Sequence, residues 1–387
     1  MQLIQTGFDG LDISYKLTIC EELAEKLEAQ RAIAEAPDSY LGLLQHNGVR
    51  MIVHASGAKG GYAFRCDTGL GGPFGENWFF KKPNGRADDW GVRVSCNALP
   101  LALNGLSKVR ASIEATLSAL GMKYEAGRES IGRVDVACDI LAPDFVADRD
   151  HFVAHAQSTI SEIMTDLMQI VGRSGRVETI TIGKNPQRQV VLYDKRAEVI
   201  AKGKSYWWPI WDAALAAQGL PPLDPTDRAQ SSVWRIEIRA YKRHLKDKWG
   251  VTTWGDLREK LPEILHYSLC DVRYTLPTGD SNRARWPDHP IWSIAHDAFA
   301  QDMEDLASMV DRAHIDALLL GRSDDALLRQ ITSCLISRAA LFGIQEDRLL
   351  NFAEGTIHQL IRGWSDDKSR IREKLAQARS RYGAVGE

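Results

Sequence analysis

The sequence predicts an α+β fold in which an antiparallel-sheet unit, ordered strand–helix–hairpin–strand with helices on one face, is internally duplicated and followed by an all-helical C-terminal domain. Apolar and polar residues alternate in the expected strands, as in sheets with one buried face. The second series of elements repeats the order of the first, and FDGLDIS (8–14) aligns with GRVDVAC (132–138). The predicted domains are residues 1–125, 126–285 (which carries the site) and 286–387.

The elements of the first half are predicted from the spacing of apolar residues, which recur every second residue in a strand and every three to four residues in a helix. Strands are predicted at 8–17, 49–56, 61–67, 76–82 and 90–99, the second and third forming a hairpin around a glycine-bearing turn. Helices are predicted at 18–36 and 103–121. The strand at 76–82 is expected to pair with the hairpin.

The second half repeats this order with one insertion. Strands are predicted at 131–140, 177–184, 188–195 and 233–240, a helix at 149–171, and an insertion at 196–230 that includes the proline-rich surface loop 221–227. Beyond Trp286, leucine, isoleucine and alanine recur three and four residues apart in 290–320, 323–342 and 346–380. This spacing predicts the helical C-terminal domain.

Composition places the chain among ordinary globular proteins, with 387 residues, 44% hydrophobic and 26% charged. The net charge of −3 does not by itself indicate a polyanionic partner. No apolar run reaches the roughly 18–20 residues that span a bilayer, and the N-terminal residues do not resemble a secretory signal. The six cysteines are scattered without a CxxC pair, which argues against a zinc ribbon or a disulfide framework. We therefore expect a cytoplasmic protein with no membrane partner.

Three strands of the second half carry charged residues on one face. In the strand 131–140, alternation places Arg133, Asp135 and Asp139 on the same side. The strand 233–240 contributes Arg235, Glu237 and Arg239 to one face, and Tyr193 shares a face with Lys195 in the strand 188–195. The simplest alternative is a solvent-exposed polar face, which any half-buried sheet has.

Carboxylates in central strand positions repel one another unless a divalent cation or nearby arginines offset their charge. Asp135 and Asp139 are four residues apart, or about 13 Å along a strand, so both cannot ligate one ion. Asp135 and Glu237 are the better pair if their strands are neighbours. Asp139 is included in the predicted metal-binding set, with three roles open: a position behind the direct ligands, orienting a basic group, or ending the strand.

The motifs R-x-D-x-x-x-D (133–139), Y-x-K-x-x-E (193–198) and R-x-E (235–237), in this order, resemble those of the Rep-trans or replication initiation factor family. These are rolling-circle initiators of plasmids and phages, to which the MobT-type relaxases are similar. The likeness covers roughly residues 8–250. It implies a DNA-nicking and joining enzyme with a duplicated sheet, a divalent metal (Mg²⁺ or Mn²⁺) and a tyrosine nucleophile.

Carried over by motif, the resemblance makes Tyr193 the nucleophile, which leaves a 5′-phosphotyrosyl link and a free 3′-OH. Asp135 and Glu237 become the main metal ligands and Lys195 a phosphate-facing cation, with Arg133 and Arg235 in the catalytic set. Asp139 and Glu198 match motif positions without an assigned role. A His-hydrophobic-His metal motif is missing, as expected for the carboxylate type, and HFVAH (151–155) is interpreted as a surface or packing feature.

DNA is the expected partner because basic residues concentrate around the motifs. From Arg173 to Lys248 there are 15 Lys or Arg and 8 Asp or Glu, a balance of 15 − 8 = +7. The predicted DNA contacts are Lys184, Arg188, Arg239, Lys242, Arg243 and Lys246. The aromatic run KSYWWPIW (204–211) could stack on bases, but clustered tryptophans more often pack in a core.

Several functional alternatives remain at this point. A relaxase for conjugative mobilisation uses the same chemistry, a non-catalytic DNA-binding regulator could keep the fold, and an unrelated α+β protein could bind a partner through its polar sheet face. No GxxxxGK[ST] motif is present, so unwinding would require a host helicase. The helical C-terminal region is open to three roles: forming a homodimer, binding the origin duplex or recruiting the helicase.

Overall fold

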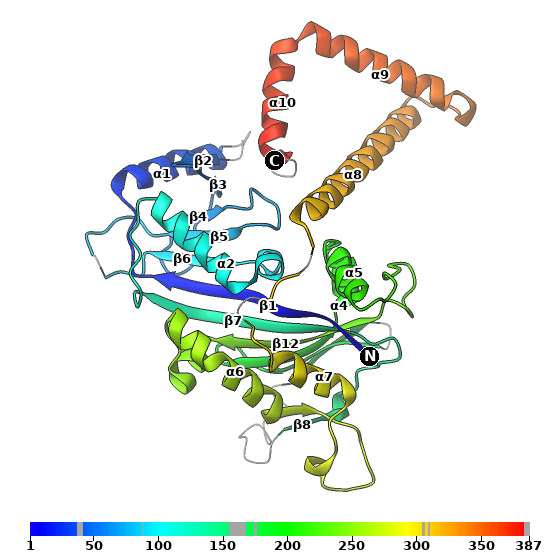
Figure 1. The fold of residues 1–387 in the computed structure, drawn as a ribbon. Coiled ribbons are helices and arrows are strands. Elements are labelled where there is room, and N and C mark those ends of the chain that lie inside the picture. Colours follow the sequence, from blue (N-terminus) through cyan, green and yellow to red (C-terminus); the bar gives the residue numbers. More distant parts are fainter. Residues whose placement is uncertain are drawn as a thin grey trace. The chain divides into compact units, whose positions relative to one another are not determined.

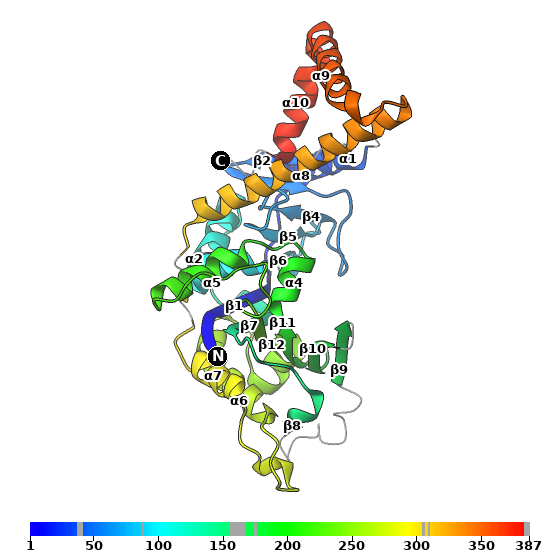
Figure 2. The same ribbon diagram turned by 90° about the vertical axis from the view of Figure 1, so that its right-hand side faces the viewer.

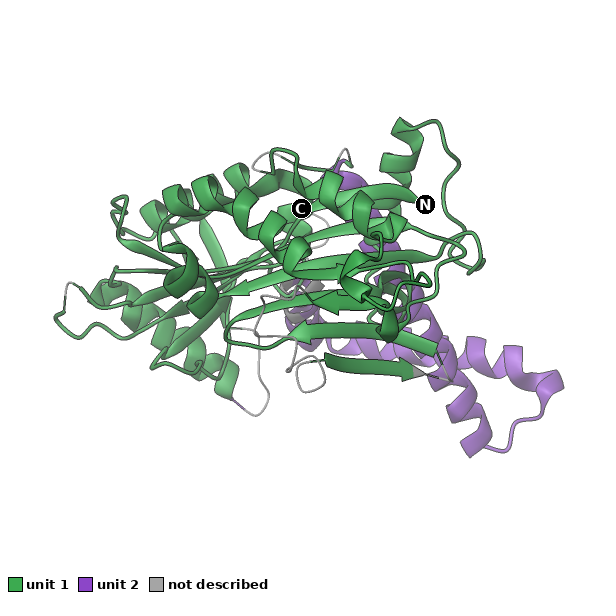
Figure 3. Ribbon diagram, turned by 90° about the horizontal axis from the view of Figure 1, so that it is seen from below, with its two compact units in different colours: residues 1–35, 42–310 green, residues 36–41, 311–387 purple. Residues whose placement is uncertain are grey.

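Side chains that alternate between apolar and polar produce a large sheet with one buried face. The computed structural model describes residues 1–36, 42–86, 88–154, 168–173, 176–303, 306–308 and 310–382. Within it the chain divides into two compact units, residues 1–35 with 42–310, and residues 36–41 with 311–387 (Figure 3). The first unit contains the sheet.

Eleven strands form this antiparallel sheet, in the order β2-β3-β4-β5-β6-β1-β7-β12-β11-β10-β9. The strands of the first half are β1 (Gln2–Tyr15), β2 (Gly42–His46), β3 (Val49–Val53), β4 (Phe64–Asp67), β5 (Glu76–Phe80) and β6 (Val92–Cys96). Those of the second half are β7 (Glu129–Leu141), β9 (Met168–Arg173), β10 (Arg176–Gly183), β11 (Arg188–Asp194) and β12 (Val233–Tyr241). A separate pair joins β8 (Phe152–Ala154) to β13 (Val272–Tyr274).

The two halves meet at the centre of the sheet, where β1 pairs with β7 (Figure 1). Their register runs from Gln2 opposite Leu141 to Tyr15 opposite Glu129. Outward from this pair, β6 and β5 follow β1 in the same way that β12 and β11 follow β7. A duplicated unit would give this order, but the duplication itself stays a prediction.

Helices cover the apolar face of the sheet. They are α1 (Glu21–Glu35), α2 (Ala98–Ala119), α6 (Trp254–Asp271) and α7 (Pro290–Phe299), and their buried residues join those of the strands in one core. Figure 2 shows α6 and α7 side by side. The inserted segment forms α4 (Lys195–Ala201) and α5 (Trp207–Ala217), which lie over part of the opposite, polar face. Sequence periodicity did not predict this cover.

The helix predicted at 149–171 is wrong wherever the structure describes it. A 3₁₀ turn (Arg149–His151) leads into β8, and residues 168–173 form β9. Strand β9 pairs with β10, the next strand in the chain, and β8 pairs with the distant β13, so strand partners satisfy these backbone groups. The middle of the expected helix, including the second histidine of HFVAH, lies outside the described residues.

The division between the units falls after residue 310 rather than at the expected 286. Helix α7 belongs with the sheet because Ile291, Trp292 and Ala295 are buried in the first unit's core. The second unit is helical as predicted, with α8 (Arg312–Leu341), α9 (Leu349–Asp366) and α10 (Lys368–Tyr382). Arg338 of α8 donates to Gln359 of α9 at 3.0 Å. No helix within the described ranges has the length and apolar character needed to cross a bilayer.

Candidate active site

A pocket of about 400 Å³ opens on the polar face of the sheet. Its walls come from β1, β6, β7, β10, β11, β12 and α4, so both halves of the chain contribute to it. Six residues predicted from the sequence line this pocket: Arg133, Asp135, Tyr193, Lys195, Glu237 and Arg239. The polar face is therefore a hollow with charged walls rather than a flat solvated surface.

Strand register explains why these side chains meet. Strand β12 lies between β7 and β11, with Glu237 opposite Ala137 on one side and opposite Val191 on the other. Asp135 and Tyr193 are each two residues from those partners, so both are diagonal neighbours of Glu237 on the same face. Diagonal neighbours in an antiparallel pair have Cα atoms roughly 7–8 Å apart, within reach of long side chains.

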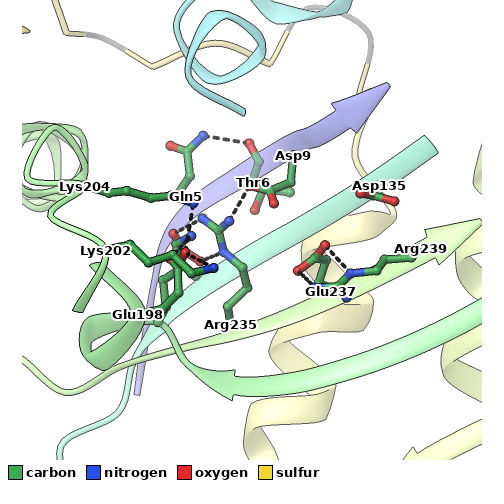
Figure 4. A network of polar contacts seen from close by, with 12 residues as sticks. Gln5, Thr6, Asp9, Asp135, Glu198, Lys202, Lys204, Arg235, Glu237 and Arg239 are labelled. Carbon is green, nitrogen blue, oxygen red and sulfur yellow. Dashed lines mark hydrogen bonds and ion pairs between the residues drawn. The ribbon is translucent and has the colours of Figure 1, made fainter. Parts of the chain in front are cut away.

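Each of the two acids in the pocket is held by an arginine from its own strand. Arg133 donates to the two carboxylate oxygens of Asp135 at 2.9 and 2.6 Å. Arg239 holds Glu237 in the same way, at 2.7 and 3.0 Å (Figure 4). Both carboxylates are buried, with exposed fractions of 4% and 1%. Buried charges require such compensation, and the two ion pairs provide it.

The Asp135 carboxyl nevertheless binds its proton tightly. Burial and the charge of Glu237 raise its pKa to about 7, against the opposing effect of Arg133. A cation shared by the two carboxylates would relieve this repulsion. Asp135 is therefore poised to change charge near neutral pH.

We expect Asp135→Asn to become increasingly more stable than the wild type as pH rises from about 4 to 7. The folded pKa lies above the value of about 3.9 for an unfolded aspartate, so the folded state binds the proton more tightly and loses stability on ionisation. Above about pH 7–8 the difference should become constant. Urea unfolding without divalent ions at pH 5, 6, 7 and 8 measures it, and a difference independent of pH would contradict the assignment.

Tyr193 is a poor nucleophile in this environment. Its side chain is 8% exposed, and burial together with Glu237 raises the pKa of the phenol well above 10. The Lys195 ammonium lies 5.7 Å from the centre of the ring. The phenolate would need further positive charge to form at neutral pH. Tyr193 is the tyrosine that lines the pocket, whereas Tyr206 and Tyr241 do not.

A cluster of lysines around Glu198 forms another wall. Glu198 accepts from Lys195 at 2.9 Å and contacts Lys202 at 3.1 Å and Lys204 at 2.9 Å. Burial opposes its ionisation, but these lysines lower the pKa of Glu198 far below its usual value. Burial and the nearby Arg235 lower the pKa of Lys195. Glu198 thus gathers three ammonium groups beside the tyrosine, which suits a phosphate.

Arg235 and Asp139 lie under the pocket and do not line it. Arg235 is 1% exposed and donates to Asp9 (Figure 4) and to the two oxygens of Asp139. Trp211 also donates to Asp139, at 2.8 Å. Asp139 is fully buried with its oxygens engaged. The geometry therefore gives it the role of orienting a basic group, and the expectations that Asp139 binds metal and that Arg235 touches the reacting groups find no support.

Asp9 is the main acid that sequence reasoning missed. Strand β1 has a bulge there, since Phe8 pairs with Val136 and Gly10 with Asp135. The bulge leaves Asp9 as the extra residue in the pocket wall. Burial opposes the ionisation of Asp9, but the positive charge of Arg235 and, to a smaller extent, that of Lys195 lower its pKa. The alignment of FDGLDIS with GRVDVAC was a signal for this segment.

Gly10 lies where β1 passes close to the carboxylate of Asp135. A Cβ atom at this position would lie 2.9 Å from Oδ2 of Asp135, closer than carbon and oxygen normally approach. Only glycine lets the backbone come this near to the carboxylate without moving it. The next polar residue on β1, Asp12, also lines the pocket.

The predicted DNA contacts divide into three groups. Lys184, Lys242, Arg243 and Lys246 are exposed, in the β10–β11 turn and after β12. Arg239 lines the pocket but holds Glu237. Arg188 points to the other face, where it is 8% exposed and forms an ion pair with Asp271. The prediction that Arg188 contacts DNA is therefore wrong. Trp207 and Trp211 are buried, which confirms the packing interpretation of the aromatic run.

Two carboxylates of the pocket are candidate ligands for a divalent metal. Within the described ranges, no three carboxylates of the pocket bring ligand atoms within 4.8 Å of one another. Asp135 and Glu237 remain as two neighbouring carboxylates in a pocket of adequate size. Mg²⁺ commonly binds through one or two carboxylates together with water and substrate phosphate, so this pair fits such an ion.

Comparison with known proteins identifies no family. No protein-family model matches the sequence, and no curated protein matches it. Among solved structures, the rolling circle replication initiator protein from Geobacillus stearothermophilus aligns with a TM-score of 0.40 and 16% identity, over 78% of this chain and 98% of that one. A likeness this distant transfers no residue roles, so the assignments rest on this chain's own residues.

Proposed function

We propose that the chain starts rolling-circle replication by nicking and rejoining DNA through Tyr193, with a divalent metal ion as cofactor. One observation carries the proposal: Tyr193, Asp135, Glu237 and Lys195, from three strands and a helix of one half, line a single pocket. Carboxylates for a metal, a phenol and surrounding cations are the groups that phosphodiester transesterification needs. The motif resemblance, which is carried by these same residues, implies the same chemistry.

The reaction exchanges one phosphodiester for another. The Tyr193 oxygen attacks phosphorus, the bond from phosphorus to the 3′ oxygen breaks, and its electron pair stays on that oxygen. The tyrosine proton leaves to solvent and the 3′ oxygen takes up a proton from solvent, giving a 5′-phosphotyrosyl link and a free 3′-OH. Since no phosphoester is hydrolysed, the reverse reaction reseals the strand.

Asp135 and Glu237 would hold the metal, which supplies charge that offsets the negative charge of the transition state. With those carboxylates bound to a cation, Arg133 and Arg239 can turn to the phosphate, for which a guanidinium is well shaped. The lysines around Glu198 line the same pocket as Tyr193 and would attract the phosphate. This exchange of partners would activate the tyrosine only when DNA and metal are both present.

The proposal is tested with labelled single-stranded oligonucleotides tiled across the genetic element that encodes the chain. The full chain is incubated with each oligonucleotide and Mg²⁺ or Mn²⁺ and then run on a denaturing gel. One region should give a covalent adduct, and mass spectrometry should place the link on Tyr193. If no tile gives an adduct or a nick under any of these conditions, the chain is not a nicking enzyme.

We expect Glu237→Gln to slow nicking and to raise the metal requirement. The amide keeps the shape of the side chain but removes the charge that attracts the cation. Half-maximal nicking should need at least roughly tenfold more Mg²⁺, because changes around metal ligands typically cost 10- to 100-fold in affinity. Glu259→Gln, on the exposed side of α6, is the matched control. If EDTA does not inhibit nicking, the proposed mechanism does not use a metal ion.

A further inference from the structure

Two histidines and a cysteine meet on the helical side of the sheet, opposite the face that carries the pocket. His266 and Cys270 are four residues apart on α6, so they share one face of the helix, and His296 comes from α7. A ligand atom from each lies within 4.8 Å of the other two, and the described residues hold no other such trio of His, Cys, Asp or Glu. We propose that His266, Cys270 and His296 bind one Zn²⁺ ion.

The distances suit tetrahedral coordination. Sγ of Cys270 lies 3.6 Å from Nε2 of His266. Bond lengths of about 2.3 Å to sulfur and 2.0–2.1 Å to nitrogen place two such ligands about 3.6 Å apart around zinc. The His266 and His296 rings have centroids 6.0 Å apart and planes inclined by 66°, so they converge without stacking. A side-chain adjustment on the order of 1 Å completes the site.

The packing of α6 and α7 positions these ligands in advance. Trp292, one helical turn before His296, is fully buried, and its indole nitrogen donates to the carbonyl oxygen of Leu269 at 3.1 Å. Leu269 immediately precedes Cys270. On the other side of Cys270, Asp271 forms the buried ion pair with Arg188 of β11. Both neighbours of the cysteine are thus fixed to other elements, which reduces the entropy lost on binding.

The ligand types select zinc over the ions expected at the pocket. A thiolate and two imidazoles favour Zn²⁺, whereas Mg²⁺ and Mn²⁺ prefer carboxylate, carbonyl and water oxygens. The Cys270 thiol loses its proton to solvent as the sulfur–zinc bond forms. His266 is exposed, so water can reach the fourth position. The ion would join α6 to α7 and has no part in DNA cleavage.

Zinc binding to the full chain tests the site directly. Protein freed of metal with a chelator is titrated with ZnSO₄, and bound zinc is counted by atomic absorption after gel filtration. The wild type should bind one ion per chain, and Cys270→Ser or His296→Gln should weaken binding by at least roughly tenfold, since a ligand is lost. His266→Gln, at an exposed position, gives the same test with little risk to folding. Cys334→Ser and His358→Gln, exposed in the second unit, should bind like the wild type.

Cobalt provides a spectroscopic readout. Co²⁺ in the same site should show a thiolate-to-cobalt charge-transfer band that Cys270→Ser lacks and Cys334→Ser keeps. A wild type without stoichiometric zinc, or a Cys270→Ser variant that retains the zinc and the band, would overturn the proposal. The outcome is independent of nicking, because the readout is bound metal rather than cleaved DNA.

Discussion

Replacing Tyr193 with phenylalanine is expected to abolish the covalent protein–DNA adduct. The substitution keeps the buried ring and removes only the hydroxyl that would attack phosphorus. Adduct formation should fall by roughly 10³-fold or more, the scale on which loss of a catalytic nucleophile acts. Affinity for the same oligonucleotide should change little, since the arginines and lysines of the pocket remain. Denaturing electrophoresis measures the adduct, and fluorescence anisotropy measures binding.

Tyr241→Phe is the matched control for this experiment. Tyr241 lies on β12, the neighbouring strand, but its hydroxyl donates to Gln189 at 2.8 Å and it does not line the pocket. This variant should form the adduct at nearly the wild-type rate. An adduct that persists in Tyr193→Phe would move the nucleophile elsewhere, with Tyr206 and Tyr241 as the residues to map first.

Arg235→Met should be the most destabilising single change in the site. The variant leaves Asp139 fully buried without its cation and removes the partner of Asp9. Breaking a buried ion pair on one side costs about 3–5 kcal/mol of unfolding free energy. Urea unfolding, followed by tryptophan fluorescence, measures this loss.

Two further variants define the cause of that loss. Arg243→Met removes an exposed guanidinium and should change the free energy of unfolding by no more than about 0.5 kcal/mol. Arg235→Met combined with Asp139→Asn should recover part of the stability, because the isolated charge is gone. A loss below about 1 kcal/mol for Arg235→Met alone would show that water or another group compensates Asp139.

The sequence predicted which face of each strand carries charge, because alternation is a local property. Asp135, Glu237 and Tyr193 therefore appeared as candidates before their strands were known to be neighbours. Which element packs over a face of the sheet, by contrast, depends on residues that are distant in the sequence. Asp139 and Arg235 are on the polar side as expected, yet Trp207 and Trp211 of α5 close over them. No periodicity within β7 or β12 could reveal that cover.

Two errors have specific causes. Arg188 was predicted to contact DNA, although it shares its strand face with Val190 and Leu192, which point into the core. A charge is tolerated there because Asp271, distant in the sequence, forms an ion pair with it. The helix expected at 149–171 rested on spaced apolar residues, which also suit short strands when partners are available. Of those partners, β10 is the next strand after β9, whereas β13 is distant from β8 in the sequence. Asp9 was missed because a bulge, rather than regular alternation, aims it into the pocket.

The central pairing of β1 with β7 also sets when activity can arise during translation. Asp9 meets Arg235 across 226 residues of chain, so the nascent N-terminal half leaves the ribosome well before the strand that carries Arg235 exists. At about 5–20 residues per second, that delay is about 11–45 s. A prematurely terminated product that stops before β12 would lack Arg235 and Glu237 and so could not form the complete pocket. Under the proposed function, unfinished copies would therefore leave DNA uncut.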